Sequence, residues 1–212
     1  MDSIKNYLVK MIPPREDWMC SLETFASEHR IPIMETDSMN FLTQLVRIHR
    51  PATILEIGTA IGYSALRMHE TNPMATITTL EKNETMYQHA VKNIQAQKKS
   101  QHINVILGDA LHTIEQLVSQ GDQYDFIFID AAKGQYQRYF TAVQPLIHAQ
   151  GIIVCDNILF KGYVADESKA ENNRIQKIAN KIRTFNDWLV KQADYHTSII
   201  PIGDGVSISI KR

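Results

Sequence analysis

The stretch Leu55-Glu56-Ile57-Gly58-Thr59-Ala60-Ile61-Gly62-Tyr63-Ser64 decides the fold class of this 212-residue chain. It overlaps a short apolar run at residues 53–56 and opens a segment with helical spacing. Its two glycines permit a tight turn and let the backbone approach a ligand closely. Their Gly-x-x-x-Gly spacing differs from the Gly-x-Gly-x-x-Gly pattern of dinucleotide-binding turns. The stretch therefore predicts a strand, a ligand-binding turn and a helix.

Apolar runs alternate with helical patterns along most of the remaining chain. The other predicted strands are residues 75–80, 103–107, 126–129 and 151–155, and the helical segments between them are residues 83–99, 110–120 and 135–148. Such alternation is typical of βαβ units and a parallel sheet. Right-handed crossovers place the carboxyl ends of parallel strands at one edge, where doubly wound folds bind ligands.

The two ends of the chain depart from this alternation. Residues 1–50 carry helical patterns interrupted by Pro13-Pro14 and Ile31-Pro32, which predicts a helical prelude to an α/β core at residues 51–212. A long amphipathic helix is predicted through residues 175–189, followed by strands at 197–200 and 206–210 that Gly203-Asp204-Gly205 joins into a hairpin. We expect one domain over residues 1–212, with a seven-stranded, mostly parallel sheet and a C-terminal antiparallel hairpin.

Composition excludes several classes of protein. The chain is 44% hydrophobic and 21% charged, which is typical of a globular domain. Its net charge of −1 gives no strong global attraction to nucleic acid or membranes, although a local basic patch is compatible with it. Cys20 and Cys155 lie far apart, without zinc-site spacing. No apolar run could span a membrane and no secretory signal begins the sequence, so we expect a cytoplasmic location.

Acidic residues at two strand ends predict the cofactor. Glu56 would be a poor neighbour for a pyrophosphate, but it suits a ligand that carries an ammonium or a sulfonium, and S-adenosylmethionine carries both. Glu81 ends the second strand, where an acidic side chain commonly accepts the hydroxyls of a ribose. After the third strand, Gly108-Asp109-Ala110 forms a turn that could hold an adenine edge.

A second group of polar residues predicts a metal site. Asp130, Asp156 and Asn157 follow the fourth and fifth strands and offer two carboxylates and an amide oxygen, which suit Mg²⁺, Mn²⁺ or Ca²⁺ better than zinc. Lys133 lies near enough to act as a general base on a substrate hydroxyl. Taken singly, Asp130 is as easily a helix cap, Asp156-Asn157 a turn and Lys133 a surface lysine. Their joint occurrence at neighbouring strand ends favours the metal site.

These motifs resemble those of a known family. The segments Glu-Ile-Gly-Thr-Ala-Ile-Gly-Tyr-Ser (56–64), Asp-Ala-Ala-Lys (130–133) and Asp-Asn (156–157) stand in the order found in the cation-dependent, catechol- and caffeoyl-CoA-type O-methyltransferases. The likeness covers nearly the whole chain and implies a Rossmann-like class I fold of S-adenosylmethionine (SAM)-dependent methyltransferases. Within the family, residues 130–136 and 156–164 most resemble the bacterial tRNA 5-hydroxyuridine methyltransferases.

The resemblance implies roles for individual residues. The residues implied to bind SAM, with S-adenosylhomocysteine (SAH) as product, are Met34, Glu56, Gly58, Tyr63, Ser64, Glu81, Asp109, Ala110 and Asp130. Mg²⁺, or Mn²⁺ or Ca²⁺ in its place, would be held by Asp130, Asp156 and Asn157. Lys133 and Asp130 would be the catalytic residues. In one departure, many relatives carry a glycine-containing segment where this chain has residues 34–40. Relatives are commonly dimers, so we expect a homodimer.

Three functions remain open at this point. The first is methylation of the 5-hydroxyl of 5-hydroxyuridine to 5-methoxyuridine at the wobble position, in a tRNA anticodon loop. The second is methylation of a small catechol or phenol, which presents the same pair of oxygens to a metal. The third, a non-enzymatic binding module on the same fold, is disfavoured because a binder has no evident need for both the metal set and Lys133.

Charge and aromatic residues near the metal motifs favour RNA weakly. Residues 161–212 contain nine Lys or Arg against six Asp or Glu, an excess of three positive charges in a chain whose net charge is −1. Basic residues beside the site could contact phosphates, although lysines on a helix are more often a solvated face. Tyr136, Phe160 and Tyr163 could stack on an unpaired base, or they could belong to the core or to a dimer interface.

Overall fold

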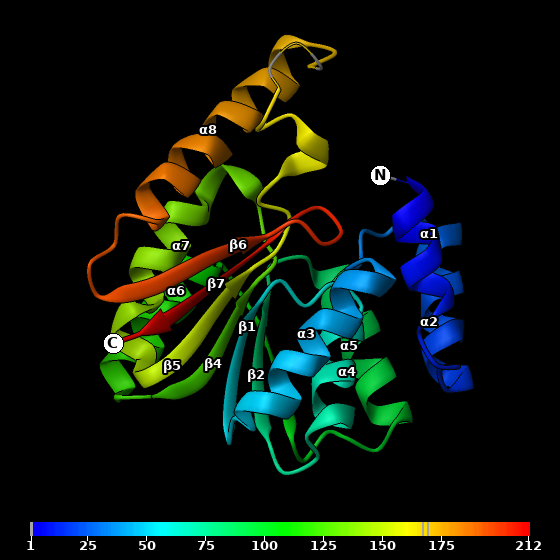
Figure 1. Cartoon of the computed structure of the whole chain (residues 1–212). Helices are drawn as coiled ribbons and strands as arrows, with labels where there is room; N and C mark the ends of the chain where they lie inside the picture. Colours follow the sequence, from blue (N-terminus) through cyan, green and yellow to red (C-terminus); the bar gives the residue numbers. More distant parts are fainter. Residues whose placement is uncertain (1, 167, 169) are drawn as a thin grey trace.

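A seven-stranded mixed sheet forms the centre of the molecule, in the order β3-β2-β1-β4-β5-β7-β6 (Figure 1). The computed structural model describes residues 2–166, 168 and 170–212. The strands are β1 (Thr53–Ile57), β2 (Thr76–Glu81), β3 (Ile103–Leu107), β4 (Tyr124–Ile129), β5 (Ile147–Cys155), β6 (Tyr195–Ile200) and β7 (Val206–Lys211). β1 to β5 run parallel, whereas β7 pairs antiparallel with both β5 and β6. The predicted sheet and terminal hairpin are confirmed.

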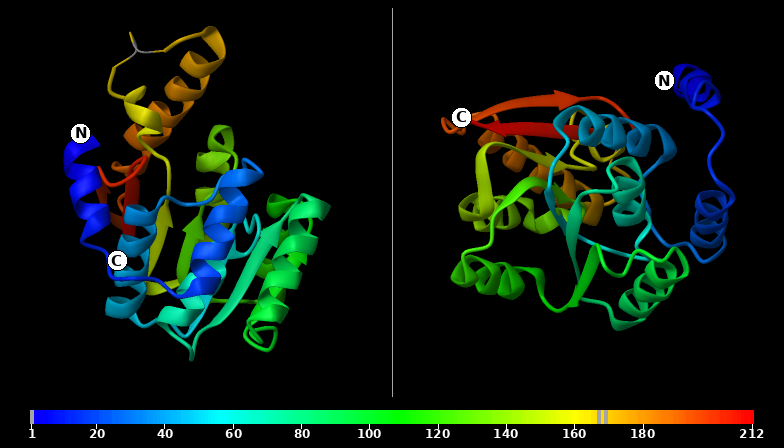
Figure 2. Two further views of the ribbon diagram at one scale, coloured as in Figure 1. Left: turned by 90° about the vertical axis from the view of Figure 1, so that its right-hand side faces the viewer. Right: turned by 90° about the horizontal axis from the view of Figure 1, so that it is seen from below.

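Helices cover both faces of the sheet (Figure 2). They are α1 (Asp2–Lys10), α2 (Asp17–Glu28), α3 (Thr36–His49), α4 (Tyr63–Thr71), α5 (Glu84–Ala96), α6 (Ala110–Gln120), α7 (Tyr136–Val143) and α8 (Asn173–Leu189). Strand alternation divides the core in two: in β4, Phe126 and Phe128 face one cluster with residues of α3 and α4, while Ile127 and Ile129 face another with residues of α7 and α8. This double burial explains the continuous apolar runs of the central strands.

The local structure differs from the prediction in the segment that leads into β5. The segment 135–148 is not one helix: α7 ends at Val143, and a short 3-10 turn leads into β5 at Ile147. Pro145 has no backbone N–H and cannot continue a helix, so the strand starts four residues earlier than expected. The N-terminal helix α1 lies before Pro13-Pro14, where the helical pattern of the prelude predicts it. Its apolar residues Ile4, Tyr7 and Leu8, with Met11 just beyond its end, are exposed, so the stripe that they form does not face the core.

The strand order reverses between β1 and β4, since the chain moves outward from β1 to β3 and then returns to β4 on the other side. The loops that follow the carboxyl ends of β1 and β4 therefore diverge there and leave a crevice, which is where open α/β sheets bind ligands. Gly58 follows β1 and Asp130 follows β4. The sheet thus brings the two main sequence motifs to one place.

Candidate functional site

A cavity of about 300 Å³ lies at the carboxyl ends of the central strands. Ten of the twelve residues predicted to form the site line it: Met34, Gly58, Tyr63, Ser64, Glu81, Ala110, Asp130, Lys133, Asp156 and Asn157. Pro32, Ile33 and Tyr139, which the sequence did not single out, also contribute to its wall. Segments from residue 32 to residue 157 therefore converge on one space large enough for a small-molecule ligand.

The turn after β1 depends on its first glycine. Gly58 has φ +106°, a conformation that strongly favours glycine, and a Cβ placed there would lie 1.9 Å from the carbonyl oxygen of Asp130. The backbone N–H of Asp130 in turn donates to the carbonyl of Ile57 at 2.9 Å. The turn and the loop after β4 are thus packed backbone to backbone, and no side chain fits between them.

Glu56 lies behind the cavity wall instead of in it. Its carboxylate is fully buried and accepts hydrogen bonds from Ser64 Oγ and, at 2.5 Å, from Thr79 Oγ1. Burial raises the pKa of Glu56 to about 8, because the two hydrogen bonds, which favour the charged form, only partly offset the loss of water. Ser64 is the residue that reaches the cavity. Any effect of Glu56 on a ligand in this structure is therefore transmitted through the Ser64 hydroxyl.

The carboxylate of Glu81 faces the cavity and is held from two sides. Oε2 accepts from the backbone N–H of Ala60 and Oε1 from that of Asn83, both at 2.8 Å. Asp109, by contrast, does not line the cavity: its Oδ1 accepts from Leu111 N at 3.0 Å and caps α6. Its neighbours Gly108 and Ala110 form that part of the wall. The turn after β3 thus contributes backbone and Cβ atoms at this point.

Asp130 and Asp156 form an acidic pair at the cavity wall, in which Asp156 is buried and Asp130 half-buried. Burial is the main cause that raises the pKa of each carboxyl, and the charge of Asp130 raises the pKa of Asp156 further. Asp156 Oδ1 is buried and lacks a hydrogen-bond partner among the described residues. Asn157 lies beside it in the cavity wall. Two carboxylates that repel one another, with an oxygen left unsatisfied, fit a divalent cation.

The predicted metal ligands are two carboxylates and one amide oxygen, and not three carboxylate, thiolate or imidazole groups. Among the residues that the structure describes, no three His, Cys, Asp or Glu side chains are grouped so as to hold a metal ion. The predicted set contains only two such side chains and completes its oxygens with the amide of Asn157. Mg²⁺ usually keeps several water or substrate ligands, so a set of this size suits it.

Asp204 is a site residue that the sequence did not point to. It lies in the turn between β6 and β7, where its Oδ2 accepts from Lys133 Nζ at 3.3 Å and its Oδ1 accepts from the backbone N–H of Lys161. The Gly203-Asp204-Gly205 pattern signals a turn and gives no indication that the turn reaches the sheet edge. The hairpin therefore holds the side chain of Lys133 at the cavity wall.

The loop after β5 is strained next to the acidic pair. Asn157, Phe160 and Lys161 have φ values of 57°, 46° and 53°, in the left-handed region that glycine adopts freely and asparagine at modest cost, but that is unfavourable for larger residues such as Phe160. Phe160 lies under Lys133, whose Nζ is 5.2 Å from the ring centroid, and it packs edge-on against Tyr163. Local strain of this kind clusters at functional sites, which agrees with a role for this loop.

Of the three aromatic residues considered for base stacking, one is not available. Tyr136 is 1% exposed, its ring packs 5.6 Å from that of Phe185, and its hydroxyl donates to the carbonyl of Asp156 at 2.8 Å. The core alternative is therefore correct for Tyr136, and the stacking alternative is wrong. Its position in α7 places it on the helix face that covers the sheet.

A second cavity, of about 380 Å³, begins at Gly134, directly after Lys133. Arg174, Lys177 and Lys181 line it, and their spacing places them on one face of α8. A Cβ at Gly134 would lie 3.7 Å from Lys181 Nζ. None of these three cations forms an ion pair with a carboxylate in the described parts of the chain. We call this the basic cleft; Glu167 and Lys169, which belong to the charge count given above, lie outside the described residues.

None of the described helices is both long and apolar enough to cross a membrane.

Comparisons with known proteins agree with this geometry. A candidate caffeoyl-CoA O-methyltransferase of Arabidopsis thaliana is 30% identical over 183 residues, which cover 86% of this chain and 78% of that one. A solved structure of a candidate caffeoyl-CoA O-methyltransferase from Staphylococcus aureus has a TM-score of 0.92 at 35% identity, over 98% of this chain and 99% of that one. An O-methyltransferase from Bacillus cereus, solved with SAH, matches in fold with a TM-score of 0.84 at 24% identity, over 99% and 97%.

The predicted class I methyltransferase fold is thus confirmed by strand order, hairpin and solved structures. The family model for O-methyltransferases matches residues 14–212, which include all of the sheet and both cavities. The chain belongs to the O-methyltransferase family.

Proposed function

We propose that this protein transfers a methyl group from SAM to the 5-hydroxyl of 5-hydroxyuridine in the anticodon loop of tRNA. The cavity supports the first half of this proposal. Glu81 presents a fixed carboxylate where a ribose would lie, and Ser64 and the Gly58 turn face the neighbouring space. The Bacillus cereus relative of the same fold was solved with SAH. A nucleoside-bearing sulfonium would fill the cavity at the carboxyl ends of β1, β2 and β4.

The acidic pair and Lys133 support the chemistry. Asp130, Asp156 and Asn157 would hold Mg²⁺, which when bound lowers the pKa of a substrate hydroxyl and orients it. In the transfer, the substrate oxygen forms a bond to the methyl carbon as the carbon–sulfur bond breaks, and SAM becomes SAH. Lys133 is our candidate for receiving the hydroxyl proton, and Asp204 keeps its side chain at the wall.

The basic cleft is the observation that most supports RNA as the substrate. It begins one residue beyond Lys133 and runs along α8 with three cations that have no carboxylate partner among the described residues. Phosphates on both sides of a base placed in the cavity could be neutralised there. A base in an anticodon loop is already unpaired, which lowers the cost of presenting it. A small phenol without phosphate groups has no use for such a cleft, whereas a CoA thioester, which carries phosphates, would also suit it.

A small catechol or phenol is the second candidate substrate. It is favoured by the relatives, since those from Arabidopsis and Staphylococcus are named for caffeoyl-CoA, a phenolic thioester. The two oxygens of a catechol also match the 4-carbonyl and 5-hydroxyl oxygens of 5-hydroxyuridine. The metal site alone therefore does not separate the two substrates.

The decisive experiment compares tRNA that contains 5-hydroxyuridine with a simple catechol, each with labelled SAM and with Mg²⁺ or chelator. We expect metal-dependent methylation of the tRNA and slow catechol turnover. Lys181→Glu should raise the KM for tRNA about tenfold without changing catechol turnover. It should also lower the slope of log KM against log salt concentration by about one, which corresponds to the loss of one phosphate contact. Lys191→Glu, an exposed lysine just beyond α8, is the matched control. Fast catechol turnover with inert tRNA would contradict the proposal.

We also propose that the protein is a homodimer in the cytoplasm. Exposed apolar side chains on α1 (Ile4, Tyr7 and Leu8) and just beyond it (Met11) support an interface at this helix, because such residues seldom gather on one free surface. Light scattering coupled to gel filtration tests this directly. We expect a mass of two chains, and a single-chain mass at micromolar concentration would overturn it.

A further inference from the structure

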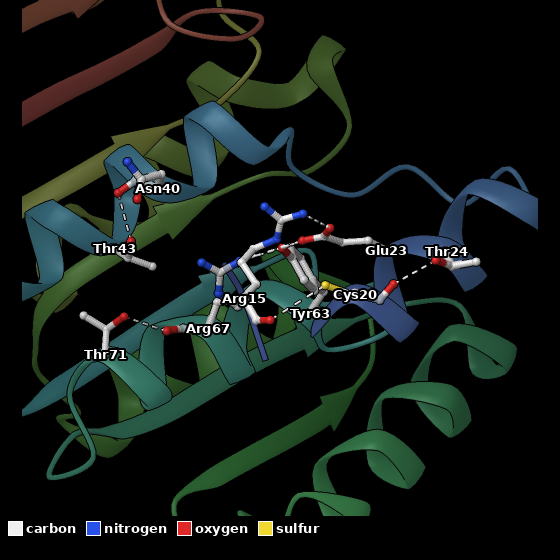
Figure 3. Close-up of polar contacts among 9 residues, drawn as sticks. All are labelled: Arg15, Cys20, Glu23, Thr24, Asn40, Thr43, Tyr63, Arg67 and Thr71. Carbon is white, nitrogen blue, oxygen red and sulfur yellow. Dashed lines mark hydrogen bonds and ion pairs between the residues drawn. The ribbon is translucent and has the colours of Figure 1, made fainter. Parts of the chain in front are cut away.

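A polar network links the outer helix α2 to the first helix of the cofactor site (Figure 3). Glu23 of α2 is its centre. Its Oε1 accepts from the hydroxyl of Tyr63 at 2.5 Å, and its Oε2 accepts from Arg15 Nη2 at 2.8 Å. Arg67, one turn after Tyr63 in α4, donates to the same hydroxyl at 2.6 Å and lies 4.0 Å from Glu23. We call these four residues the Glu23 cluster.

The cluster is largely withdrawn from water. Tyr63 is 2% exposed and the Arg67 side chain 10%, while the Glu23 side chain is 20% exposed. Burial and the neighbouring Glu23 carboxylate hold the pKa of Tyr63 far above its usual range, so the phenol stays protonated and acts as a donor to Glu23. Removing one member would leave buried donors or charges without partners, which is costly in such a setting.

Both ends of the cluster lead to the cofactor cavity. Tyr63 lines it, and Ser64, the next residue, carries the hydroxyl that reaches it. On the other side, α2 ends at Glu28, and Pro32, Ile33 and Met34 form a wall of the same cavity a few residues later. Glu23 therefore joins two of the segments that enclose the cofactor.

Helix α2 depends on side-chain contacts for its position. With α1 it lies at the margin of the molecule, farther from the sheet than α3 and α4 (Figures 1 and 2). Met19 and Ala26 of α2 are buried in the core, whereas Trp18, Leu22 and Phe25 are only partly buried against it. The contacts of Glu23 add a charged anchor to this apolar packing and help to fix the helix and the segment that follows it.

We propose that Glu23 is a positioning residue for the cofactor, which holds Tyr63 and α2 in place so that residues 32–34 close the cavity. The inference rests on the proposed function only in taking SAM and SAH as the ligands of that cavity. Since coupling between two events is reciprocal, SAH binding should also stabilise the docking of α2 on the core.

The test measures SAH affinity by calorimetry and amide hydrogen exchange in residues 17–28, with and without SAH. We expect Glu23→Ala to weaken SAH binding about tenfold and to abolish the protection that SAH gives to α2. Glu23→Gln keeps an acceptor for Tyr63 and should recover most of the affinity. Tyr63→Phe keeps the ring at the cavity, and combining it with Glu23→Ala should add little, because both changes break the same contact.

Glu28→Ala is the matched control, because it removes an exposed carboxylate from the same helix. It should bind SAH as the wild-type chain does, and thermal unfolding should show all variants folded at the assay temperature. If Glu23→Ala binds SAH within twofold of wild type, or if Glu28→Ala weakens binding equally, the inference is wrong. Failure of the wild-type chain to bind SAH would instead contradict the proposed function.

Discussion

Two aspartates at opposite ends of the sheet show how differently the same side chain is used. Asp125, at the amino end of β4, accepts three hydrogen bonds on Oδ2: from Ala52 N at 2.8 Å, Thr53 N at 3.0 Å and Thr53 Oγ1 at 3.2 Å. Asp156, after the carboxyl end of β5, is 1% exposed and leaves Oδ1 without a partner among the described residues. The first carboxylate ties two strands together, and the second is held ready for a ligand.

The backbone at the two edges differs in how closely segments approach. Left-handed conformations occur at both edges, at Arg50 and Gly121 before β1 and β4 and at Gly58 and Asn157 after β1 and β5. A Cβ at Gly121 would have no atom within 4 Å, whereas a Cβ at Gly58 would lie 1.9 Å from the carbonyl oxygen of Asp130. The close contact between two backbone segments thus belongs to the ligand-binding edge.

The largest expected effect comes from adding a side chain at Gly58, where two backbone segments are in contact at the carboxyl edge. Gly58→Ala would place a Cβ 1.9 Å from the Asp130 carbonyl oxygen at a φ of +106°, so we expect a loss of about 3 to 5 kcal/mol in the free energy of unfolding and no measurable SAH binding. Gly121→Ala, at φ +78° with no atom within 4 Å of the new Cβ, should cost only about 1 kcal/mol. Urea unfolding and calorimetry measure both. Equal losses in the free energy of unfolding would show that the positive φ angle, and not the contact with Asp130, determines the cost of each substitution.

The matched pair Asp156→Asn and Asp125→Asn tests the comparison itself. Asp156→Asn removes repulsion within the acidic pair, so stability in chelator should be unchanged or higher, while metal-dependent methyl transfer should fall by roughly 100-fold or more. Asp125→Asn should cost about 1 to 2 kcal/mol of stability and leave turnover unchanged at a permissive temperature. A variant of Asp156 that transfers methyl groups normally would remove the basis for the metal site.

A smaller effect, dependent on pH, belongs to the amino edge. Burial, with nearby Lys99 and His102, lowers the pKa of His69 to about 4. In the unfolded chain this residue is protonated near pH 6.5. Between pH 6.5 and pH 4 the unfolded state therefore binds one proton that the folded state does not, and the free energy of unfolding decreases as the pH is lowered. The loss should reach about 3 kcal/mol at pH 4, and it should be absent above pH 6.5.

Replacing the histidine isolates that contribution. His69→Gln should flatten the slope of stability against pH in this window, whatever its effect on absolute stability, whereas His148→Gln, on an exposed residue, should leave the slope unchanged. Urea unfolding at several pH values measures the slopes. A wild-type slope retained by His69→Gln would assign the acid sensitivity to other groups.

Sequence patterns could predict most of the fold and ten members of the cavity wall. Parallel strands buried on both faces give continuous apolar runs, and their polar termini must meet at one edge, so the positions of Asp130 and Asp156 followed without coordinates. The direction of a side chain is harder to predict. Glu56 and Asp109 lie at or just beyond the carboxyl ends of strands, as Glu81 does, but Glu56 is held in the core by Ser64 and Thr79, and Asp109 is used as a helix cap.

Contacts between segments distant in sequence could not be predicted. Asp204 meets Lys133 only because the antiparallel β7 packs beside β5 and carries the turn to the carboxyl edge. Glu23 meets Tyr63 only because α2 docks across α4. Neither contact leaves a periodic pattern in the sequence, since each involves a single side chain at the end of a long connection.

The place of Asp204 in the chain has a consequence for synthesis. Asp204 is translated about 170 residues after Met34, which takes roughly 10 to 30 s at ordinary elongation rates. During the last part of that time β5 has no β7 beside it and is an open edge strand, and Lys133 has no carboxylate from the hairpin. Until β7 is synthesised, the edge of β5 that it covers in the folded chain is therefore unpaired and able to pair with a neighbouring chain.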